Sequence, residues 1–418
     1  MSEGGLSFAL VGTGGSSGRT LAAVERSIRE RRPDARFLFV DTQPFNLRTR
    51  GTTRYDGGGD VVLVSPEDCG IRSRTGSQTT NLLLSGGPIA YARLVNRMAT
   101  LLGRRHDALI LCHDRMYAET GLVRAAHRLG TPTALLQEGP FCAIGHGRPQ
   151  NRTLRLKAAL APVVNFGGLI PPIPDYGCAG HDKVLAASSA YRDKWIAAGV
   201  SAEKIDVVGI PRYDALAALR LSPDPLPEGR PLRLLYLVQP FAAHGKVDAA
   251  AAERLQQVFA EGLNRVVGDV PFELTIRAHP RSGRDDVATL AAQLTMPVIR
   301  DAGDAPLEAV LEHTDVVIGH YSSGLLETLL LGRRILCLPV PADAFAERSE
   351  ADKQLWMSGL GAPVARTPGE VEIALRRLSN GEGGAVSTEK LSEEAGLVDG
   401  QAAARCAQSI LELAGLKA

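Results

Sequence analysis

The chain lacks the features by which disulfide-stabilised, zinc-binding and nucleic-acid-binding proteins are recognised. Its six cysteines are scattered over 418 residues and include no C-x-x-C pair. That usage fits free thiols in a reducing cytoplasm rather than a disulfide framework or a zinc site. The charges balance, with 47 Lys and Arg against 46 Asp and Glu. No excess of positive charge is available to attract a polyanion, so nucleic-acid binding is not expected as the main function.

The sequence also shows no pattern typical of a targeting segment or a membrane span. The N-terminus, MSEGGLSFALVGTGG, has no basic region ahead of its short apolar run, so we expect no signal peptide. No stretch reaches the roughly 18 uninterrupted apolar residues of a membrane span. The nearest, 158–174, is broken by Pro, Gly and Asn. We expect a soluble, cytoplasmic protein.

Short β-branched runs alternate with longer stretches of helical period, which predicts an α/β fold with parallel sheets. Strands are predicted at 6–12, 35–41, 60–65, 107–113, 131–137, 183–188 and 205–210, and again at 233–240, 272–278, 296–300, 314–320 and 334–340. Helices are predicted at 18–31, 80–102, 118–129, 152–160, 189–198 and 403–415.

A proline-rich segment divides the two series of strands. Residues 222–231, SPDPLPEGRP, hold four prolines and no apolar periodicity, as a linker does. We therefore expect an N-terminal domain at 1–221 and a second domain at 232–402, followed by a C-terminal helix at 403–418. Both domains should be doubly wound and Rossmann-like, facing each other across a cleft. In such sheets ligands bind beyond the carboxyl ends of the strands.

The first motif at a strand end is VGTGGSSG, residues 11–18. Glycines let the backbone approach a ligand, and the start of a helix offers N–H groups. This indicates a ligand-facing loop formed by Gly12, Gly14, Gly15 and Ser16, although a glycine-rich turn can also be merely tight. The spacing is not G-x-G-x-x-G, and no Lys follows as in a P-loop.

The second and third motifs place ionisable residues after strands. In LLQEGP, Glu138 ends an apolar strand, where a carboxylate can serve as a general base or simply cap the next element. In TIRAHPRSG, His279 follows a strand and is restricted by the next residue, a proline. Arg277 and Arg281 beside it favour an anion site, whereas a lone histidine at a strand end can be structural.

The fourth motif is GHYSSGLLETLLLG, residues 319–332. Ser322, Ser323 and Gly324 stand where a strand meets a helix, so hydroxyls and N–H groups can converge on a phosphate. Glu327 lies about one turn further on, where its carboxylate can accept ribose hydroxyls. The alternative is local: Ser is a common N-cap, and Glu327 then faces solvent.

Together these motifs resemble the GT-B fold of nucleotide-sugar enzymes. GTGGSSGRTLAA is similar to the glycine loop of lipid-linked N-acetylglucosaminyl transferases of peptidoglycan synthesis, and 183–216 is similar to a segment of bacterial surface-polysaccharide transferases. That group includes relatives of bacterial sialyltransferases, Kdo transferases and CDP-polyol phosphotransferases. Bacterial sialyltransferases carry an acidic pair plus Gly, then His-Pro, then Ser-Ser; here the order is QEG (137–139), HP (279–280) and SS (322–323).

The resemblance implies a metal-independent glycosyltransferase without a cofactor. Glu138 would be the base that deprotonates the acceptor hydroxyl, and His279 would help the nucleotide depart. The serines would bind the phosphate, with Arg277 nearby, and Glu327 would hold the donor ribose. The donor would be a CMP- or UDP-sugar, and the acceptor a glycan, a lipid-linked or a small molecule. Gln137 departs from the acidic pair, and this leaves the base of the nucleotide open.

Three other functions stay open. A UDP-N-acetylglucosamine 2-epimerase shares the fold and the HP segment but usually has a different glycine loop. A CDP-polyol phosphotransferase would use a His-Gly base, for which His146-Gly147 is a counterpart. A degenerate GT-B protein would bind a nucleotide without turnover.

Three further features of the sequence give weaker indications of function. Cys142 and His146 have no companion pair, so no metal site is expected there. His113-Asp114 can contact an acceptor or form a structural turn. The basic stretch 148–157 either contacts the inner face of a membrane or forms a solvated helix face.

Overall fold

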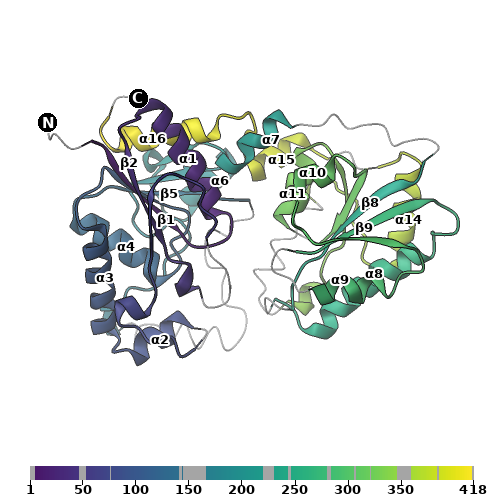
Figure 1. Cartoon of the computed structure of the whole chain (residues 1–418), viewed down its shortest axis with the longest axis horizontal. Coiled ribbons are helices and arrows are strands. Elements are labelled where there is room, and N and C mark those ends of the chain that lie inside the picture. Colours follow the sequence, from purple (N-terminus) through teal and green to yellow (C-terminus); the bar gives the residue numbers. More distant parts are fainter. Residues whose placement is uncertain are drawn as a thin grey trace. The chain divides into compact units, whose positions relative to one another are not determined.

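Two compact units make up the chain, as seen in a computed structural model. Unit 1 comprises residues 1–215 with 393–418, and unit 2 comprises residues 216–392 (Figure 1). The structure describes residues 5–46, 53–75, 77–140, 144, 166–219, 230–242, 246–279, 284–305, 307–320, 322–345, 359–383 and 386–416.

Unit 1 is built on a seven-stranded parallel sheet with the order β3-β2-β1-β4-β5-β6-β7. Its strands are β1 (Ser7–Gly12), β2 (Arg36–Asp41), β3 (Asp60–Leu63), β4 (Ala108–Leu111), β5 (Thr133–Leu136), β6 (Lys183–Ala186) and β7 (Ile205–Val207). In the register, Gly12 at the end of β1 lies opposite Asp41 at the end of β2. The loops after β1 and β2 therefore leave the sheet side by side.

The helices of unit 1 connect these strands. They are α1 (Ser17–Arg31), α2 (Gln78–Leu84), α3 (Pro88–Leu102), α4 (Tyr117–Arg128), α6 (Ser189–Ala197) and α7 (Asp214–Ala218). The boundary between the two units falls within α7. Short 3-10 turns lie at η1 (Gln43–Phe45), η2 (Glu67–Cys69), η3 (Phe166–Gly168), η4 (Ala202–Lys204) and η5 (Pro211–Tyr213). The C-terminal helix α16 (Ala402–Leu413) packs against α1 (Figure 1). Its buried residues, Cys406 and Ile410 among them, join the core made by β1, β2 and α1.

Unit 2 has a five-stranded parallel sheet with the order β10-β9-β8-β11-β12. The strands are β8 (Leu232–Leu237), β9 (Phe272–Arg277), β10 (Val298–Asp301), β11 (Val316–Gly319) and β12 (Arg334–Cys337). The helices are α8 (Ala249–Asn264), α9 (Arg284–Ala291), α10 (Leu307–Leu311), α11 (Ser323–Leu330), α14 (Pro368–Ser379) and α15 (Thr388–Ala395), with a 3-10 turn at η6 (Ala342–Ala344). The boundary with unit 1 falls within α15. Helix α8 packs against α14 (Figure 1), and Phe259 and Val371 are fully buried in the core.

The predicted fold class is confirmed: both sheets are parallel and helices alternate with strands. All twelve predicted strands are present. The predicted helix 80–102 is two helices, α2 and α3, because Gly86 and Gly87 adopt φ of 114° and 58° and Pro88 starts the second one. Left-handed glycines followed by a proline end one helix and begin another.

Parts of the sequence analysis fall outside the described residues. They are most of the linker 222–231, the helix 152–160, the stretch 148–157, the pair His146-Gly147, and Cys142. The boundaries 1–221, 232–402 and 403–418 stay a prediction about independently folding domains. The five cysteines in the described part are free thiols. No helix within the described ranges is long and apolar enough to cross a membrane.

Candidate functional site

The glycine loop joins β1 to α1 in unit 1. Gly14 and Gly15 have φ of 95° and 65°, which non-glycine residues rarely adopt. Gly12 has another reason to be glycine, since a Cβ there would lie 2.4 Å from the ring of Phe39. Packing thus accounts for Gly12, and the turn geometry accounts for Gly14 and Gly15. The loop itself brings Ser16 to the start of α1.

Ser16 is the N-cap residue of α1, but its hydroxyl does not cap the helix. The Ser16 Oγ instead donates a 2.5 Å hydrogen bond to Oε1 of Glu138, two residues beyond the end of β5. The structure therefore brings together two predicted site residues from separate motifs. A hydrogen bond to a carboxylate stabilises its ionised form and fixes its orientation, which a general base requires.

The residues beside Glu138 hold its backbone in place. Gln137 is fully buried, its Nε2 donates to the carbonyl of Gly139 at 3.0 Å, and its Oε1 accepts from the N–H of Ala187 at 2.9 Å. An ionised carboxylate at position 137 could not donate to the carbonyl of Gly139. This bond explains why Gln137 stands where the sialyltransferase pattern has an acidic residue. The thiol of Cys112 lies nearby: burial raises its pKa well above the usual value, and the charge of Glu138 adds to the shift.

Arg212, which the motifs in the sequence did not indicate, also lies close to the QEG segment. One Nη of Arg212, in η5, lies 3.4 Å from the position that a Cβ on Gly139 would occupy. Its Nη2 donates to the hydroxyl of Tyr213 at 2.9 Å, and the guanidinium stacks over that ring at 4.7 Å. A cation fixed beside Glu138 suits an anionic group of a substrate. The only signal in the sequence was its place in the 183–216 segment.

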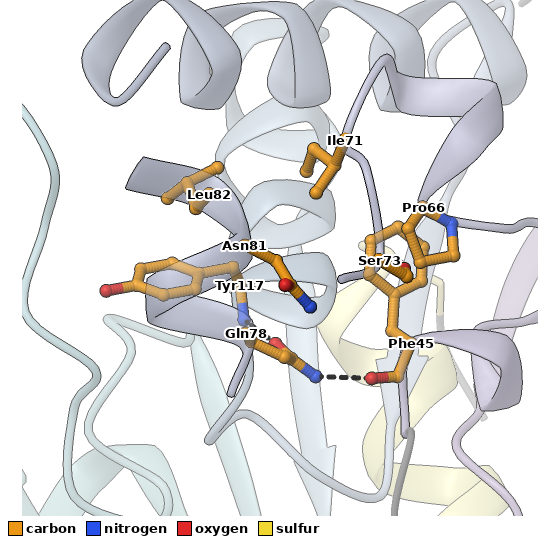
Figure 2. Close-up of a pocket in the computed structure, with 8 residues that line it drawn as sticks. All are labelled: Phe45, Pro66, Ile71, Ser73, Gln78, Asn81, Leu82 and Tyr117. Carbon is orange, nitrogen blue, oxygen red and sulfur yellow. Dashed lines mark hydrogen bonds between the residues drawn. The ribbon is translucent and has the colours of Figure 1, made fainter. Parts of the chain in front are cut away.

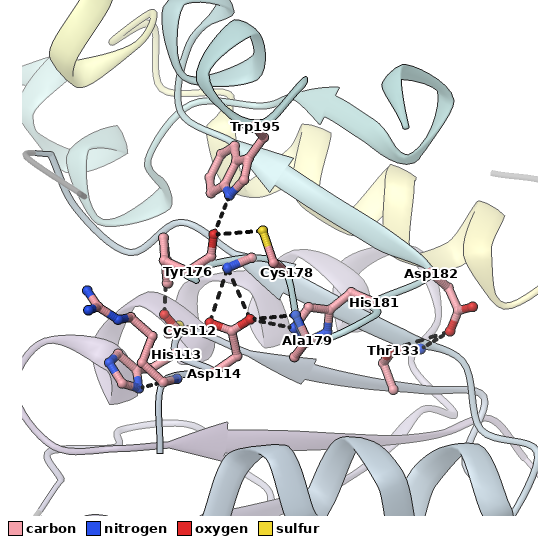
Figure 3. Close-up of polar contacts among 12 residues, drawn as sticks. Cys112, His113, Asp114, Thr133, Tyr176, Cys178, Ala179, His181, Asp182 and Trp195 are labelled. Atoms are coloured by element: carbon pink, nitrogen blue, oxygen red, sulfur yellow. Dashed lines mark hydrogen bonds and ion pairs between the residues drawn. The ribbon is translucent and has the colours of Figure 1, made fainter. Parts of the chain in front are cut away.

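Of the pair His113-Asp114, which follows β4, Asp114 has a structural role (Figure 3). The Asp114 carboxylate is fully buried and accepts from the N–H groups of Gly177 at 3.0 Å and Ala179 at 3.2 Å, and it lies 3.2 Å from Nε2 of His181. These bonds close the loop before β6 over the end of β4. Burial lowers the pKa of His113 to about 4, so its imidazole is neutral. Asp114 therefore holds the sheet edge together rather than contacting an acceptor.

A small pocket lies beside the N-terminus of α4 (Figure 2). Phe45, Leu82 and Tyr117 line it, and Nε2 of Gln78 donates to the carbonyl of Phe45 at 2.9 Å across it. Its volume is about 10 Å³, which is roughly the space for one water molecule. This pocket is too small to hold a sugar.

The fourth motif forms the start of α11 in unit 2. Ser322 is its N-cap, and the Oγ accepts from the N–H of Leu325 at 3.3 Å. A Cβ on Gly324 would lie 3.4 Å from Leu237, which is an ordinary van der Waals contact. Glu327 is half-buried one turn along the helix. Ser322 thus caps the helix, and because its Oγ is the acceptor in that bond, the bond does not use the hydroxyl proton.

His320 is a further residue that the sequence analysis did not use. It is buried between the ends of three strands: its Nδ1 lies 2.6 Å from the carbonyl of Leu338, and its Nε2 lies 3.1 Å from the hydroxyl of Tyr236. Burial lowers its pKa to about 4. The neutral ring therefore donates from Nδ1, since a carbonyl only accepts, and accepts at Nε2 from Tyr236. His320 fixes the end of β11 directly before the α11 start.

Unit 2 also holds a ligand-sized cavity. It measures about 670 Å³ and is lined by the first turns of α8 and the segment after β12, including Leu255, Val340 and Leu338. The exposed side chains of Arg254 and Arg366 also line it. Sites for small molecules typically measure about 300–1,000 Å³. His320, which precedes the α11 start, bonds to the carbonyl of Leu338, a residue that lines the cavity.

Arg277 does not have the phosphate-binding arrangement that the sequence suggested. Its nearly buried guanidinium donates to Asp301 at 2.5 Å and to the carbonyls of Gly303, at 3.3 Å, and Ala305. These bonds join the end of β9 to the loop after β10. A phosphate contact would have to displace them, so we leave Arg277 out of the proposed site.

His279 lies in unit 2, two residues beyond the end of β9, and is half-buried. Strand β8 separates β9 from β11 in the sheet. Pro280, Arg281 and the side chain of Ser323 fall outside the described residues. The described residues contain no group of three or more His, Cys, Asp and Glu side chains placed to hold a metal ion.

Comparison with known proteins identifies the fold. No family model matches the chain, and no curated protein matches its sequence. Solved structures do match over nearly its full length. The UDP-GlcNAc 2-epimerase from Methanocaldococcus jannaschii has a TM-score of 0.57 at 13% identity, covering 97% of this chain and 100% of the other.

Two further structures are similar. The UDP-GlcNAc 2-epimerase from Neisseria meningitidis bound to UDP-GlcNAc has a TM-score of 0.52 at 11% identity, covering 97% and 98%. CalG4, the calicheamicin glycosyltransferase, has a TM-score of 0.54 at 16% identity, covering 99% of each chain. The chain thus has the GT-B type of fold, which nucleotide-sugar epimerases and glycosyltransferases share.

Proposed function

We propose that the protein is a glycosyltransferase that moves a sugar from a CMP- or UDP-sugar to a hydroxyl of a glycan, lipid-linked or small-molecule acceptor in the cytoplasm. Glu138 takes the proton of the acceptor hydroxyl as its oxygen attacks the anomeric carbon. The bond from that carbon to the nucleotide phosphate breaks, and the electron pair leaves with the phosphate. Single displacement of this kind inverts the anomeric configuration.

The observation that carries this proposal is the hydrogen bond from Ser16 to Glu138. It places a half-buried, oriented carboxylate at the carboxyl end of β5, where ligands bind in parallel sheets. The guanidinium of Arg212 lies beside the next residue, Gly139. A carboxylate that only completed a turn would not need a dedicated donor from another loop.

The donor side of the proposal rests on unit 2. The start of α11, with Ser322, Ser323 and Gly324, offers N–H groups and hydroxyls to a phosphate, and Glu327 follows to accept ribose hydroxyls. His279 donates to the departing phosphate. The 670 Å³ cavity of unit 2, lined by α8 and the segment after β12, offers room for the rest of the donor. Charge on the leaving phosphate is then stabilised by a helix N-terminus and an imidazole, which needs no metal ion.

Epimerisation of a UDP-sugar is the second candidate, because the similar structures include 2-epimerases, one with UDP-GlcNAc bound. The two reactions differ in their need for an acceptor. An epimerase consumes UDP-GlcNAc without one, whereas a transferase releases nucleotide in proportion to added acceptor. CDP-polyol phosphotransfer stays open through His146-Gly147.

Thermal shift against CMP, CDP, UDP, GDP and TDP, each with and without Mg²⁺, tests nucleotide binding. Binding to the folded state raises the melting temperature. We expect a selective shift with CMP or UDP that does not depend on Mg²⁺. A shift with CDP alone favours the polyol phosphotransferase. If no nucleotide raises the melting temperature at millimolar concentration, the proposed donor site is wrong.

A further inference from the structure

A carboxylic acid is buried beneath the glycine loop of unit 1. Glu119, in the first turn of α4, is completely buried, and its Oε1 lies 2.6 Å from Oγ1 of Thr42. Its Oε2 has no hydrogen-bond partner among the residues that the structure describes. An ionised carboxylate in such a place would leave half of its charge unpaired, which is costly.

The hydrogen bonds of Thr42 indicate where the proton is. Its Oγ1 also lies 3.1 Å from the carbonyl oxygen of Gly12. A threonine hydroxyl has one proton, and a carbonyl oxygen only accepts. Each bond has a proton of its own only if Glu119 donates its carboxyl proton to Thr42 while Thr42 donates to Gly12. The arrangement is therefore that of a neutral Glu119.

The surrounding charges favour the same state. Burial raises the pKa of Glu119 to about 7, against the opposing effect of its hydrogen bonds to Thr42 and to its own backbone N–H, and the negative charge of Asp114, from the loop after β4, adds to the rise. Asp41, at the end of β2 beside Thr42, is a second carboxylate on this edge of the sheet and accepts from Thr53 and Gln43. Among the residues that the structure describes, the charged side chain that contributes to the shift is thus an acidic one.

The chain of bonds from Glu119 ends on the glycine loop. The Gly12 carbonyl, which also accepts from the N–H of Thr42 at 2.8 Å, is the last before the loop turns away from β1. Within the loop, Ser17 Oγ accepts from Thr13 and donates to Gly14. The loop is then braced at its base by Thr42 and internally by Ser17, and it carries Ser16 to Glu138.

We propose that Glu119, in its neutral form, is a positioning residue that holds the glycine loop through Thr42 so that Ser16 meets Glu138. Loss of its proton turns the Thr42 hydroxyl toward Glu119, which breaks the hydroxyl bond to the Gly12 carbonyl, leaves only the backbone N–H bond there and loosens the loop. The order of the loop does not depend on the reaction. Only the effect on turnover rests on the proposed function.

Hydrogen exchange of peptides covering residues 12–18, measured from pH 5.5 to 8.5 and corrected for the chemical rate, tests the proposal. Below pH 7 the ionised fraction of Glu119 rises about tenfold per pH unit, and above pH 7 it levels off, so exchange in the wild type should rise by up to about tenfold per unit toward pH 7 and level off above it. Glu119→Gln cannot ionise and should show no such rise. Thr42→Val should exchange faster at every pH, whereas Thr42→Ser should follow the wild type.

Glu30→Gln is the matched control, since Glu30 is an exposed carboxylate on α1; it should follow the wild type. The proposal is overturned if wild-type protection is the same at pH 6 and pH 8.5, or if Glu119→Gln loses protection as the wild type does. Turnover adds a separate readout: kcat/KM should fall on the alkaline side in the wild type and not in Glu119→Gln. If exchange behaves as predicted but Glu138→Gln turns over normally, the loop proposal stands and the proposed function fails.

Discussion

The hydroxyl of Ser16 and the carboxylate of Glu138 lie 2.5 Å apart although 122 positions separate them in the chain. Strand β4 lies between β1 and β5, so the glycine loop reaches over it to meet the end of β5. Ser16 gives up the usual capping bond of its helix for this contact. The donor is therefore committed to holding the carboxylate.

Removing the donor should change the pH dependence of catalysis. Ser16→Ala takes away a hydrogen bond that favours the ionised carboxylate, so the pKa of Glu138 should rise. The acidic side of the kcat/KM profile should then move upward by roughly half to one pH unit. Because Ser16 makes no capping bond, the melting temperature should hardly change.

Ser188→Ala is the matched control for that substitution. Ser188 caps α6 by accepting from Tyr191 at 3.3 Å, and it donates to the carbonyl of Glu393 at 2.5 Å. It should cost about 1 kcal/mol or more of stability and leave the pH profile in place. An unchanged profile in Ser16→Ala would show that its bond does not tune Glu138.

The start of α11 allows capping and phosphate binding to be separated. Ser322→Ala removes the acceptor for the N–H of Leu325 and should cost about 1 kcal/mol of stability. It also removes a donor to the phosphate, so nucleotide affinity should fall by about tenfold. Affinity is measured by titration calorimetry with the nucleotide that raises the melting temperature of the wild type.

Thr367→Ala supplies the comparison, because Thr367 caps α14 of the same unit by accepting from Glu370 at 3.2 Å. It should destabilise the protein equally and leave nucleotide affinity unchanged. Equal affinity loss in the two variants would mean that Ser322 acts through helix stability alone.

The fold could be predicted because each strand is a short β-branched run bounded by turn residues. Strands such as β1 and β11 are buried along their whole length, as both faces of a parallel sheet are covered. The helix 80–102 was predicted without its break. There the left-handed conformations of Gly86 and Gly87 end α2, although the helical period continues through α3.

The site could be predicted only as far as its motifs. The glycine loop and QEG are visible in the sequence, but their contact through Ser16 arises from the order of the strands. Arg277 is basic and stands beside the HP motif, yet Asp301 and two carbonyls, all distant in sequence, take up its guanidinium. His320 and Glu119 were missed because burial, which the sequence shows poorly for polar residues, gives them their roles.

Arg277 should matter for stability. Arg277→Ala leaves the Asp301 carboxylate and two carbonyls without their donor, and should lower the free energy of unfolding by about 2–4 kcal/mol. Arg300→Ala, one residue earlier on β10 than Asp301, removes an exposed guanidinium and should change it by less than about 0.5 kcal/mol. Urea unfolding compares the two variants, and equal effects would contradict the structural role of Arg277.

Glu119 should make the protein less stable as the pH rises. Its pKa is raised to about 7 in the folded state from 4.5, so between these values the folded chain holds a proton that the unfolded chain has lost. Stability from this group is full below pH 4.5, falls through the window and is level above pH 7. Glu119→Gln should remove that slope. Between pH 4.5 and pH 8, the free energy of unfolding of the variant should therefore rise relative to that of the wild type by up to about 3 kcal/mol. Urea unfolding at several pH values measures it, and an unchanged slope would contradict a buried neutral acid.

The central claim is that Glu138 is the base of a nucleotide-sugar transferase, and Glu138→Gln tests it most directly. Turnover and nucleotide-induced thermal shift are measured on the same preparation, with Glu30→Gln as the control. The account predicts an unchanged shift with turnover reduced by at least about a hundredfold. Turnover at the wild-type rate in Glu138→Gln, with nucleotide binding intact, would contradict it.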